Sequence, residues 1–329
     1  MKHIAYMLLV AVSVSLIIAG CESQVTDTSS EPEGERALAL KGSADNSLEI
    51  GPEVSLQDIM ASMNEMMAAE GFDFRVYKAE YITAGESNEA GAEILAKDLG
   101  NKQLGSDFVP NDVRRGWSNP GFAGDTDDIT FAIDQTGDAT PFSPGVSGAE
   151  ATAAIQSAMS TWDNRTCSDL ALNRAQDFGI DIGVIAFLNG LSGSPFVFAD
   201  IQHAGFRDIN FAGGVLGVAF TFVFTESGVP TDIDGNGKND VAFREIYYDP
   251  SWLWTVGGFP GVDIETIALH EAGHGLSQAH FGNIFRKKGE IVVNPKAVMN
   301  AVYLGGEQRS LLGTDNGGHC SNWGEWPNN

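Results

Sequence analysis

The sequence predicts a protein of the α+β class, with a single large domain over residues 111–329. Its predicted elements run in the order strand, helix, several strands and a second helix. Strands and helices do not alternate regularly along the chain, which is typical of the α+β class. About 220 residues are enough to bury one core of their own. No internal repeat divides the chain further.

The elements of this domain follow from composition and periodicity. Residues 128–133 have the composition of a first strand, and residues 148–161 carry an apolar stripe at helical spacing that ends at Trp162. Further strands are expected at residues 181–188 and 196–201. Residues 214–224 combine Val, Phe and Thr in the strongest strand pattern of the chain. The domain is therefore expected to contain a sheet and at least two helices.

Residues 52–110 are expected to form a smaller N-terminal module. Residues 54–69 have helical periodicity with a methionine-rich face that we expect to be buried, and residues 72–83 have strand composition. A second element is expected at residues 92–99, between glycines. The module could be a pro-segment or a structural layer. A latency cysteine on a metal is excluded, because no cysteine occurs between residues 22 and 166.

The first twenty residues have the pattern of a targeting segment, with Lys2 before an apolar run that is too short for a confident membrane span. The run ends in Leu-Ile-Ile-Ala-Gly-Cys, which resembles a bacterial lipobox. The resemblance implies cleavage before Cys21 and lipid on its sulfur, with stable membrane anchoring. The alternative is an ordinary secretory signal. Glu22 favours an outer-membrane or cell-surface address, and residues 21–51 are expected to form a flexible tether.

The net charge of −25 argues against nucleic acid as a partner, because binding to phosphates requires a basic face. It also disfavours electrostatic attraction to anionic lipid. The oligomeric state is open, and a monomer is the expectation. Apart from Cys21, the chain has Cys167 and Cys320, which would form a disulfide in an oxidising compartment or remain free thiols.

The strongest signal is the run His-Glu-Ala-Gly-His-Gly-Leu-Ser-Gln-Ala-His at residues 270–280, which holds half of the six histidines in the chain. On a helix, His270 and His274 lie on one face and can bind one ion. Glu271 points aside and can reach a water on that ion. His280 must return after a turn as a third ligand. Three neutral ligands with one open position are typical of a catalytic zinc.

This run resembles the signature of the metzincin metallopeptidases, and residues 262–269 look like the helix that carries it in matrixins. The resemblance implies zinc, with Glu271 as the general base. It also implies a twisted, mostly parallel sheet with an antiparallel edge strand, packed on long helices, and a zinc cleft between an upper and a lower subdomain. Asp263 is the expected N-cap of the zinc helix. Met299 is similar to the family's Met-turn methionine beneath the ligands.

Two further features follow from the resemblance. The family has Gly where this chain has Ser277, so a sharp turn made by Gly275 and Ser277 is expected at a cost of roughly 1–2 kcal/mol for a left-handed L-residue. In the family, the edge strand above the cleft pairs with an extended substrate. Residues 214–219 are the candidate for that strand in this chain.

An acidic loop is a second candidate metal site. Oxygen side chains at alternate positions resemble the first half of an EF-hand loop, but Phe243 stands where the bidentate Glu would be. The loop could hold Ca²⁺ or could be an Asx-rich turn. Its candidate ligands are Asp232, Asp234, Asn236 and Asp240, with Glu245 as an alternative to Asp240 at the end of the loop.

The resemblance thus implies a zinc endopeptidase that acts on proteins or peptides, tethered outside the cytoplasm by lipid. Two alternatives stay open: a non-catalytic, zinc-stapled binding module, and a peptidase of another HExxH clan in which His280 is not a ligand.

Overall fold

The structure is a computed structural model that describes residues 56–85, 104–115, 128–177, 179–209, 211, 214–287 and 290–328. These residues all belong to one unit, Ala37–Asn329. The predicted signal segment, the tether and the element at residues 92–99 lie outside the described residues. Among the helices of the described ranges, none has both the length and the apolar character needed to cross a membrane.

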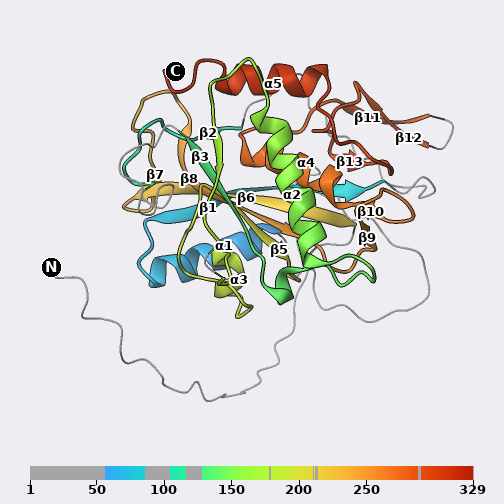
Figure 1. The fold of residues 1–329 in the computed structure, drawn as a ribbon. Coiled ribbons are helices and arrows are strands. Elements are labelled where there is room, and N and C mark those ends of the chain that lie inside the picture. The colour runs from blue at the N-terminus through green and yellow to red at the C-terminus, as the bar shows by residue number, and fades with distance from the viewer. Residues whose placement is uncertain are drawn as a thin grey trace, which may run out of the picture. The chain divides into compact units, whose positions relative to one another are not determined.

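The fold is α+β, as predicted, with a mostly parallel central sheet (Figure 1). Seven strands form its main path, in the spatial order β13 (Val302–Tyr303), β1 (Phe74–Ala84), β6 (Val215–Glu226), β8 (Asn239–Tyr248), β5 (Ile201–Phe206), β3 (Ile129–Ile133) and β4 (Leu172–Arg174). The short strands β2 (Ser106–Asp107) and β7 (Val229–Pro230) pair with β8 and β6. Of the main path, β6 alone runs against both of its neighbours.

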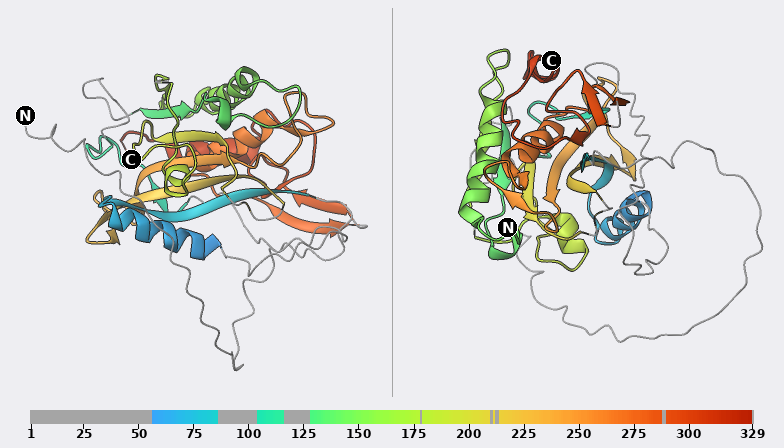
Figure 2. Two further views of the ribbon diagram at one scale, coloured as in Figure 1. Left: turned by 90° about the horizontal axis from the view of Figure 1, so that it is seen from below. Right: turned by 90° about the vertical axis from the view of Figure 1, so that its right-hand side faces the viewer.

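The predicted position of the antiparallel strand at the edge of the sheet is wrong. Strand β6 agrees with the segment predicted at residues 214–224, but it lies between β1 and β8. Strand β1 comes from the N-terminal module and pairs with β6 in antiparallel register from Phe74 to Thr83. Figure 2 shows β1, in cyan, running beside β6. The sequence prediction failed because it assigned β1 to a separate module.

Helices cover both faces of the sheet (Figure 1). One face carries α2 (Gly148–Asp163), α4 (Ile264–Gly275) and α5 (Gly313–Trp323), and the other carries α1 (Leu56–Ala69) and the short α3 (Val184–Leu188). Each face has its own core. Trp162 and Met159 of α2 pack in the first core, and Met63 and Met67 of α1 pack in the second.

The strand predicted at residues 181–188 is wrong, because this segment contains the helix α3. Gly183 has a φ of 117°, which interrupts extended backbone, and the N–H groups of Val184 and Ile185 donate to the Glu245 carboxylate on β8. Short apolar runs do not distinguish a buried strand from a buried helix. The distant Glu245 therefore decided the conformation.

The strand predicted at residues 196–201 is also wrong, since β5 begins only at Ile201. The apolar character of the preceding residues reflects packing: Val197 and Phe198 contact the core on the α1 side of the sheet. The Phe198 N–H donates to the Gln202 side chain at 2.9 Å instead of joining a strand ladder.

The remaining elements surround the C-terminal half. Strands β9 (Trp254–Thr255) and β10 (Val262–Asp263) pair just before α4, and β11 (Asn283–Lys287) and β12 (Glu290–Asn294) form a hairpin that is separate from the central sheet. A 3₁₀ turn, Gly137–Ala139, precedes α2. The predicted helix at residues 148–161 is confirmed as α2, whose N-cap Ser147 forms a capping box with Glu150.

Candidate metal centre

Helix α4 carries the first two histidines and the glutamate of the motif. It begins at the N-cap Asp263, as predicted, whose carboxylate accepts from the Thr266 N–H at 2.9 Å and from its hydroxyl at 2.7 Å. Arg309 donates to the same carboxylate and fixes it. The helix is buried along its length, so His270, Glu271 and His274 are all 0% exposed.

The three histidines of the motif lie together. The Nε2 atoms of His270 and His274 are 3.1 Å apart, and the Nε2 of His280 is 3.3 Å from the first and 3.2 Å from the second. The outer ring nitrogens face backbone oxygens. Nδ1 of His270 lies 2.7 Å from the Val298 carbonyl, and Nδ1 of His274 lies 2.9 Å from the Gln278 carbonyl.

These contacts determine which nitrogens carry protons. A carbonyl oxygen can only accept, so both Nδ1 atoms must donate and both Nε2 atoms of the neutral rings present lone pairs. Burial lowers the pKa of His270 to about 3 and that of His274 well below its usual value, so the rings are neutral near pH 7. Two lone pairs at 3.1 Å repel each other. A cation between the rings would turn this repulsion into coordination.

The spacing of the nitrogens fits zinc. Zinc–nitrogen bonds of about 2.0–2.1 Å at tetrahedral angles place two ligand nitrogens roughly 3.3 Å apart. The three measured separations, 3.1–3.3 Å, agree with this value. Hydrogen bonds from the outer ring nitrogens to carbonyls also orient metal-bound histidines in general. Residues His270, His274 and His280 could therefore hold one zinc ion with one position left open.

The turn that returns His280 is made as the sequence predicts. Helix α4 ends at Gly275, and Ser277 is left-handed with a φ of 63°. The buried Arg244 stabilises this turn, because its guanidinium donates to the Ser277 hydroxyl at 2.9 Å and to the Gly275 carbonyl at 2.8 Å. A serine at this position therefore gains a charged partner that a glycine would lack.

Met299 packs against the zinc-ligand helix. A Cβ on Gly273 would collide with the Met299 sulfur, so the glycine between His270 and His274 leaves room for the thioether. Asp315 of α5 holds this segment, since its carboxylate accepts from the N–H groups of Val298 at 3.0 Å and Met299 at 3.2 Å. Sequence analysis missed Asp315, because no local pattern links it to a segment 16 residues away.

Glu271 lies between the helix and the sheet. A Cβ on Gly217 of β6 would be 3.1 Å from both Cγ and Oε1 of Glu271, so a larger residue there would crowd the glutamate side chain. Burial, and then the nearby Glu80 carboxylate, raise the pKa of Glu271 well above its usual value, while the Ile82 backbone opposes that rise. A buried carboxyl group beside a metal site can accept a proton from a water and return it.

Strand β1 supplies charged groups that sequence analysis did not assign to the site. Lys78 and Glu80 form an ion pair, and Glu80 is only 5% exposed. Burial and then Lys78 lower the pKa of His280 to about 4. The strand pattern at residues 72–83 does place alternate side chains on one face. It could not show that this face would meet the histidines.

The acidic loop brings three of its four candidate ligands together. Carboxylate oxygens of Asp232, Asp234 and Asp240 lie within 4.8 Å of one another. The Asn236 oxygen instead accepts from the Lys238 N–H at 2.8 Å. Asp240 also accepts from Arg114 at 2.8 Å, so one cationic partner is already present. Burial raises the pKa of Asp234, the Asn236 N–H opposes that rise, and the carboxylates of Asp107, Asp232 and Asp240 add to it.

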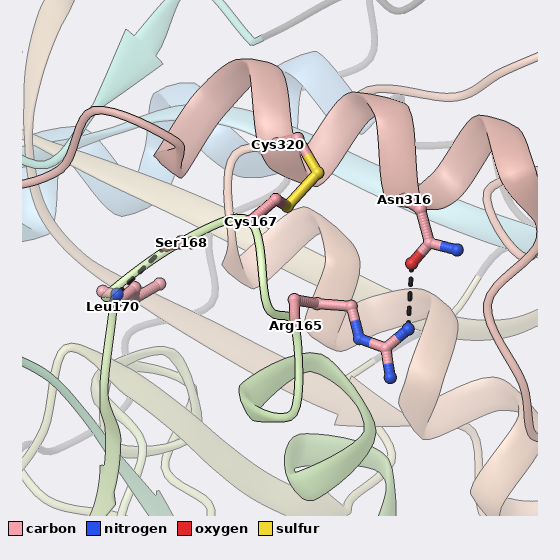
Figure 3. The surroundings of a disulfide bond; sticks show 6 residues. All are labelled: Arg165, Cys167, Ser168, Leu170, Asn316 and Cys320. Atoms are coloured by element: carbon pink, nitrogen blue, oxygen red, sulfur yellow. Dashed lines mark hydrogen bonds between the residues drawn. A yellow bond between two sulfur atoms is a disulfide. The ribbon is translucent and has the colours of Figure 1, made fainter.

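A disulfide joins Cys167 to Cys320, with Cα atoms 5.5 Å apart (Figure 3). It links the loop after α2 to α5, and the adjacent Arg165 donates to Asn316 at 2.9 Å. The bridge thus holds α5, which carries Asp315, to the helix layer that contains α4. Cys21 lies outside the described residues.

No protein-family model matches this chain, and no curated protein matches it either.

Proposed function

We propose that this protein is a zinc-dependent endopeptidase of the metzincin type, similar to the matrixins. The observation that carries the proposal is the triangle of Nε2 atoms, 3.1–3.3 Å apart, in which His270 and His274 face each other with lone pairs. The α+β fold and the position of Met299 against the ligand helix support the same family. The implied zinc cleft between an upper and a lower subdomain belongs to this proposal.

Each residue has a definite role in the proposed reaction. His270, His274 and His280 would hold zinc, which when bound supplies Lewis-acid chemistry that polarises a scissile carbonyl and lowers the pKa of a water. Glu271 would accept the proton of the attacking water and would then pass it to the leaving amine. Its carboxyl is buried where Gly217 of β6 leaves room for the side chain.

Two other functions compete with this proposal. A zinc-stapled binding module would use the same three histidines but has no need of Glu271. A peptidase of another HExxH clan would not use His280, and the 3.2 Å and 3.3 Å approaches of its Nε2 to the other two rings favour a ligand role. Replacement of His280 by Ala with unchanged zinc stoichiometry would support that second alternative.

The test is the conservative variant Glu271→Gln. We expect it to bind one zinc per chain and to lose chelator-sensitive cleavage of a denatured protein by roughly 10²-fold or more, the usual contribution of a general base. Glu265→Gln is the matched control, because Glu265 lies on the same helix but faces Ser157 and Arg309. Full activity in Glu271→Gln would refute the mechanism.

We further propose that the protein is an exported lipoprotein, anchored at the outer membrane or cell surface through Cys21, with proteins or peptides as substrates and no nucleic-acid partner. The lipobox-like run before Cys21 and the net charge of −25 support this proposal. We also propose that the acidic loop binds Ca²⁺, because Asp232, Asp234 and Asp240 converge there.

A further inference from the structure

The candidate catalytic site is largely covered. His270, Glu271 and His274 are each 0% exposed and His280 is partly exposed, although a peptidase must bring an extended backbone to these groups. The residues that interact with the Glu271 carboxyl come from two neighbouring strands. Gly217 belongs to β6, while Glu80 and Ile82 belong to β1. Strand β1 is therefore the element that lies against the reactive groups on the side of the sheet.

Strand β1 occupies the edge of β6 that an extended peptide would need. The two strands pair antiparallel from Phe74 to Thr83, and Ile82 stands opposite Gly217, the residue that touches Glu271. Main-chain hydrogen bonds along a strand edge do not depend on sequence, so the edge that holds β1 would hold any extended chain in its place. Both cannot bind to that edge at once.

The even-numbered side chains of β1 point to opposite faces of the sheet in its first and second halves. A bulge between Val76 and Lys78 changes the alternation. Phe74 and Val76 consequently pack in the core on the α1 side, whereas Ile82 packs in the core that contains α4. Glu80 has the same parity as Ile82, which directs its buried carboxylate toward the face with the histidines. A divalent cation held there would offset the repulsion between Glu80 and Glu271.

The contacts that hold β1, the strand that covers the candidate site, lie away from the histidines. Phe74 stacks edge-on against Phe222 and Phe243 with ring centroids 5.9 and 4.9 Å apart, and Met63 and Met67 of α1 are buried beside them. The far end of β1 pairs with β13. These contacts hold β1 independently of any metal. In the uncut chain, β1 can therefore leave the edge of β6 only transiently, and its full release requires the chain between Gly85 and Leu104 to be cut.

We propose that β1 occupies the place of an extended substrate on β6, so that residues 56–85 hold the endopeptidase latent until they are released. The inference rests on the proposed function. It identifies β6 as the strand that pairs with substrate once β1 has left. Latency is then due to β1 itself, because residues 52–110 contain no cysteine that could bind the metal.

The first experiment locks β1 in place in the full-length chain. Tyr81 faces Val218 across the strand pair, on the side of the sheet away from the histidines. Directly opposed positions have Cβ atoms close enough for a disulfide. The double variant Tyr81→Cys/Val218→Cys is compared with the two single variants, which cannot form the cross-link. The readouts are cleavage of a denatured protein and the rate of zinc transfer to a chromogenic chelator.

The second experiment releases β1. A recognition sequence for a specific protease is placed between Gly85 and Leu104, with Phe74→Ala to loosen the docked strand, and the cut chain is compared with the uncut one. The variant with the recognition sequence and native Phe74 is the control. Retained tryptophan fluorescence and one zinc per chain show that the remainder stays folded.

We expect the lock to lower cleavage and zinc transfer, and the release to raise both by roughly tenfold or more, as when a closed state dominates a two-state equilibrium. Cleavage by the locked chain at the rate of the single variants would overturn the inference and leave the proposed function intact. If the lock and the cut change zinc transfer but none of the variants cleaves protein, β1 covers the metal site and the proposed endopeptidase function is wrong. If neither changes zinc transfer, the inference that β1 covers the site is refuted.

Discussion

Replacement of Ser277 by Gly tests whether the left-handed turn before His280 is limited by backbone strain or by its partner Arg244. Ser277 has a φ of 63°, and the cost of that conformation for an L-residue is about 1–2 kcal/mol. Glycine removes this cost but adds roughly 0.5–1 kcal/mol of unfolded-state entropy, which leaves a gain of about 0.5–1 kcal/mol.

The serine hydroxyl accepts a 2.9 Å bond from the Arg244 guanidinium, which is 0% exposed. Loss of a hydrogen bond to a charged group costs about 1.5–3 kcal/mol, which exceeds the gain from glycine. We therefore expect Ser277→Gly to lower the free energy of unfolding by about 1–2 kcal/mol. Ser277→Ala should lower it further, because alanine loses the same bond and keeps the strained backbone.

The assay is urea unfolding of zinc-loaded protein, followed by tryptophan fluorescence. Ser227→Gly is the control, because Ser227 has a φ of 52° but is exposed in the turn between β6 and β7. There the relief of strain should be neutral or slightly stabilising. If Ser277→Gly were more stable than the native chain, strain would outweigh the Arg244 contact and the reasoning would fail.

Three further predictions concern pH, calcium and lipid. Burial lowers the pKa of His203 to about 3 and that of His319 to about 4, both below the unfolded value near 6.5. Between these values the unfolded chain binds more protons than the folded chain. The free energy of unfolding should therefore fall as the pH drops from about 6.5 toward 4. His319→Asn should make this slope shallower by about 1.4 kcal/mol per pH unit in metal-free protein, and an unchanged slope in urea titrations would contradict the assignment. Roughly millimolar Ca²⁺ should raise the melting temperature of the native chain but not of Asp234→Asn; equal shifts in the two would argue against the loop as the binding site. Cys21→Ser should move the exported protein from the membrane fraction to the soluble fraction, and its retention in the membrane would rule out the lipid anchor.

Much of the metal centre could be predicted from sequence because its geometry is local. The spacing of His270 and His274 follows from one helical turn, and Asp263 caps that helix through a hydrogen bond to a residue three positions away. The left-handed turn at Ser277 could be expected from Gly275 and the short spacing to His280, although the distant Arg244 also stabilises it. The helix spacing and the cap depend on backbone geometry that neighbouring residues impose.

The fold was predictable only in part. The α+β class and the elements α2 and β6 follow from periodicity, but the segment at residues 181–188 has the same apolar composition whether it forms a strand or a helix. The carboxylate of Glu245 decided that it is helical by accepting the first two N–H groups of α3. Glu245 is some 60 residues away in the chain, beyond the reach of any pattern read along the segment.

By itself, the sequence determined that three imidazoles and a carboxylate would gather at one end of a helix, since helical spacing and a tight turn are short-range properties. Only the tertiary structure decided that β6 lies inside the sheet and that Glu80 of β1 lies near Glu271. The physical reason is that every strand edge offers the same backbone N–H and C=O groups. Which edge pairs with which depends on the packing of side chains such as Phe74 and Phe222, and those contacts exist only after the chain has folded.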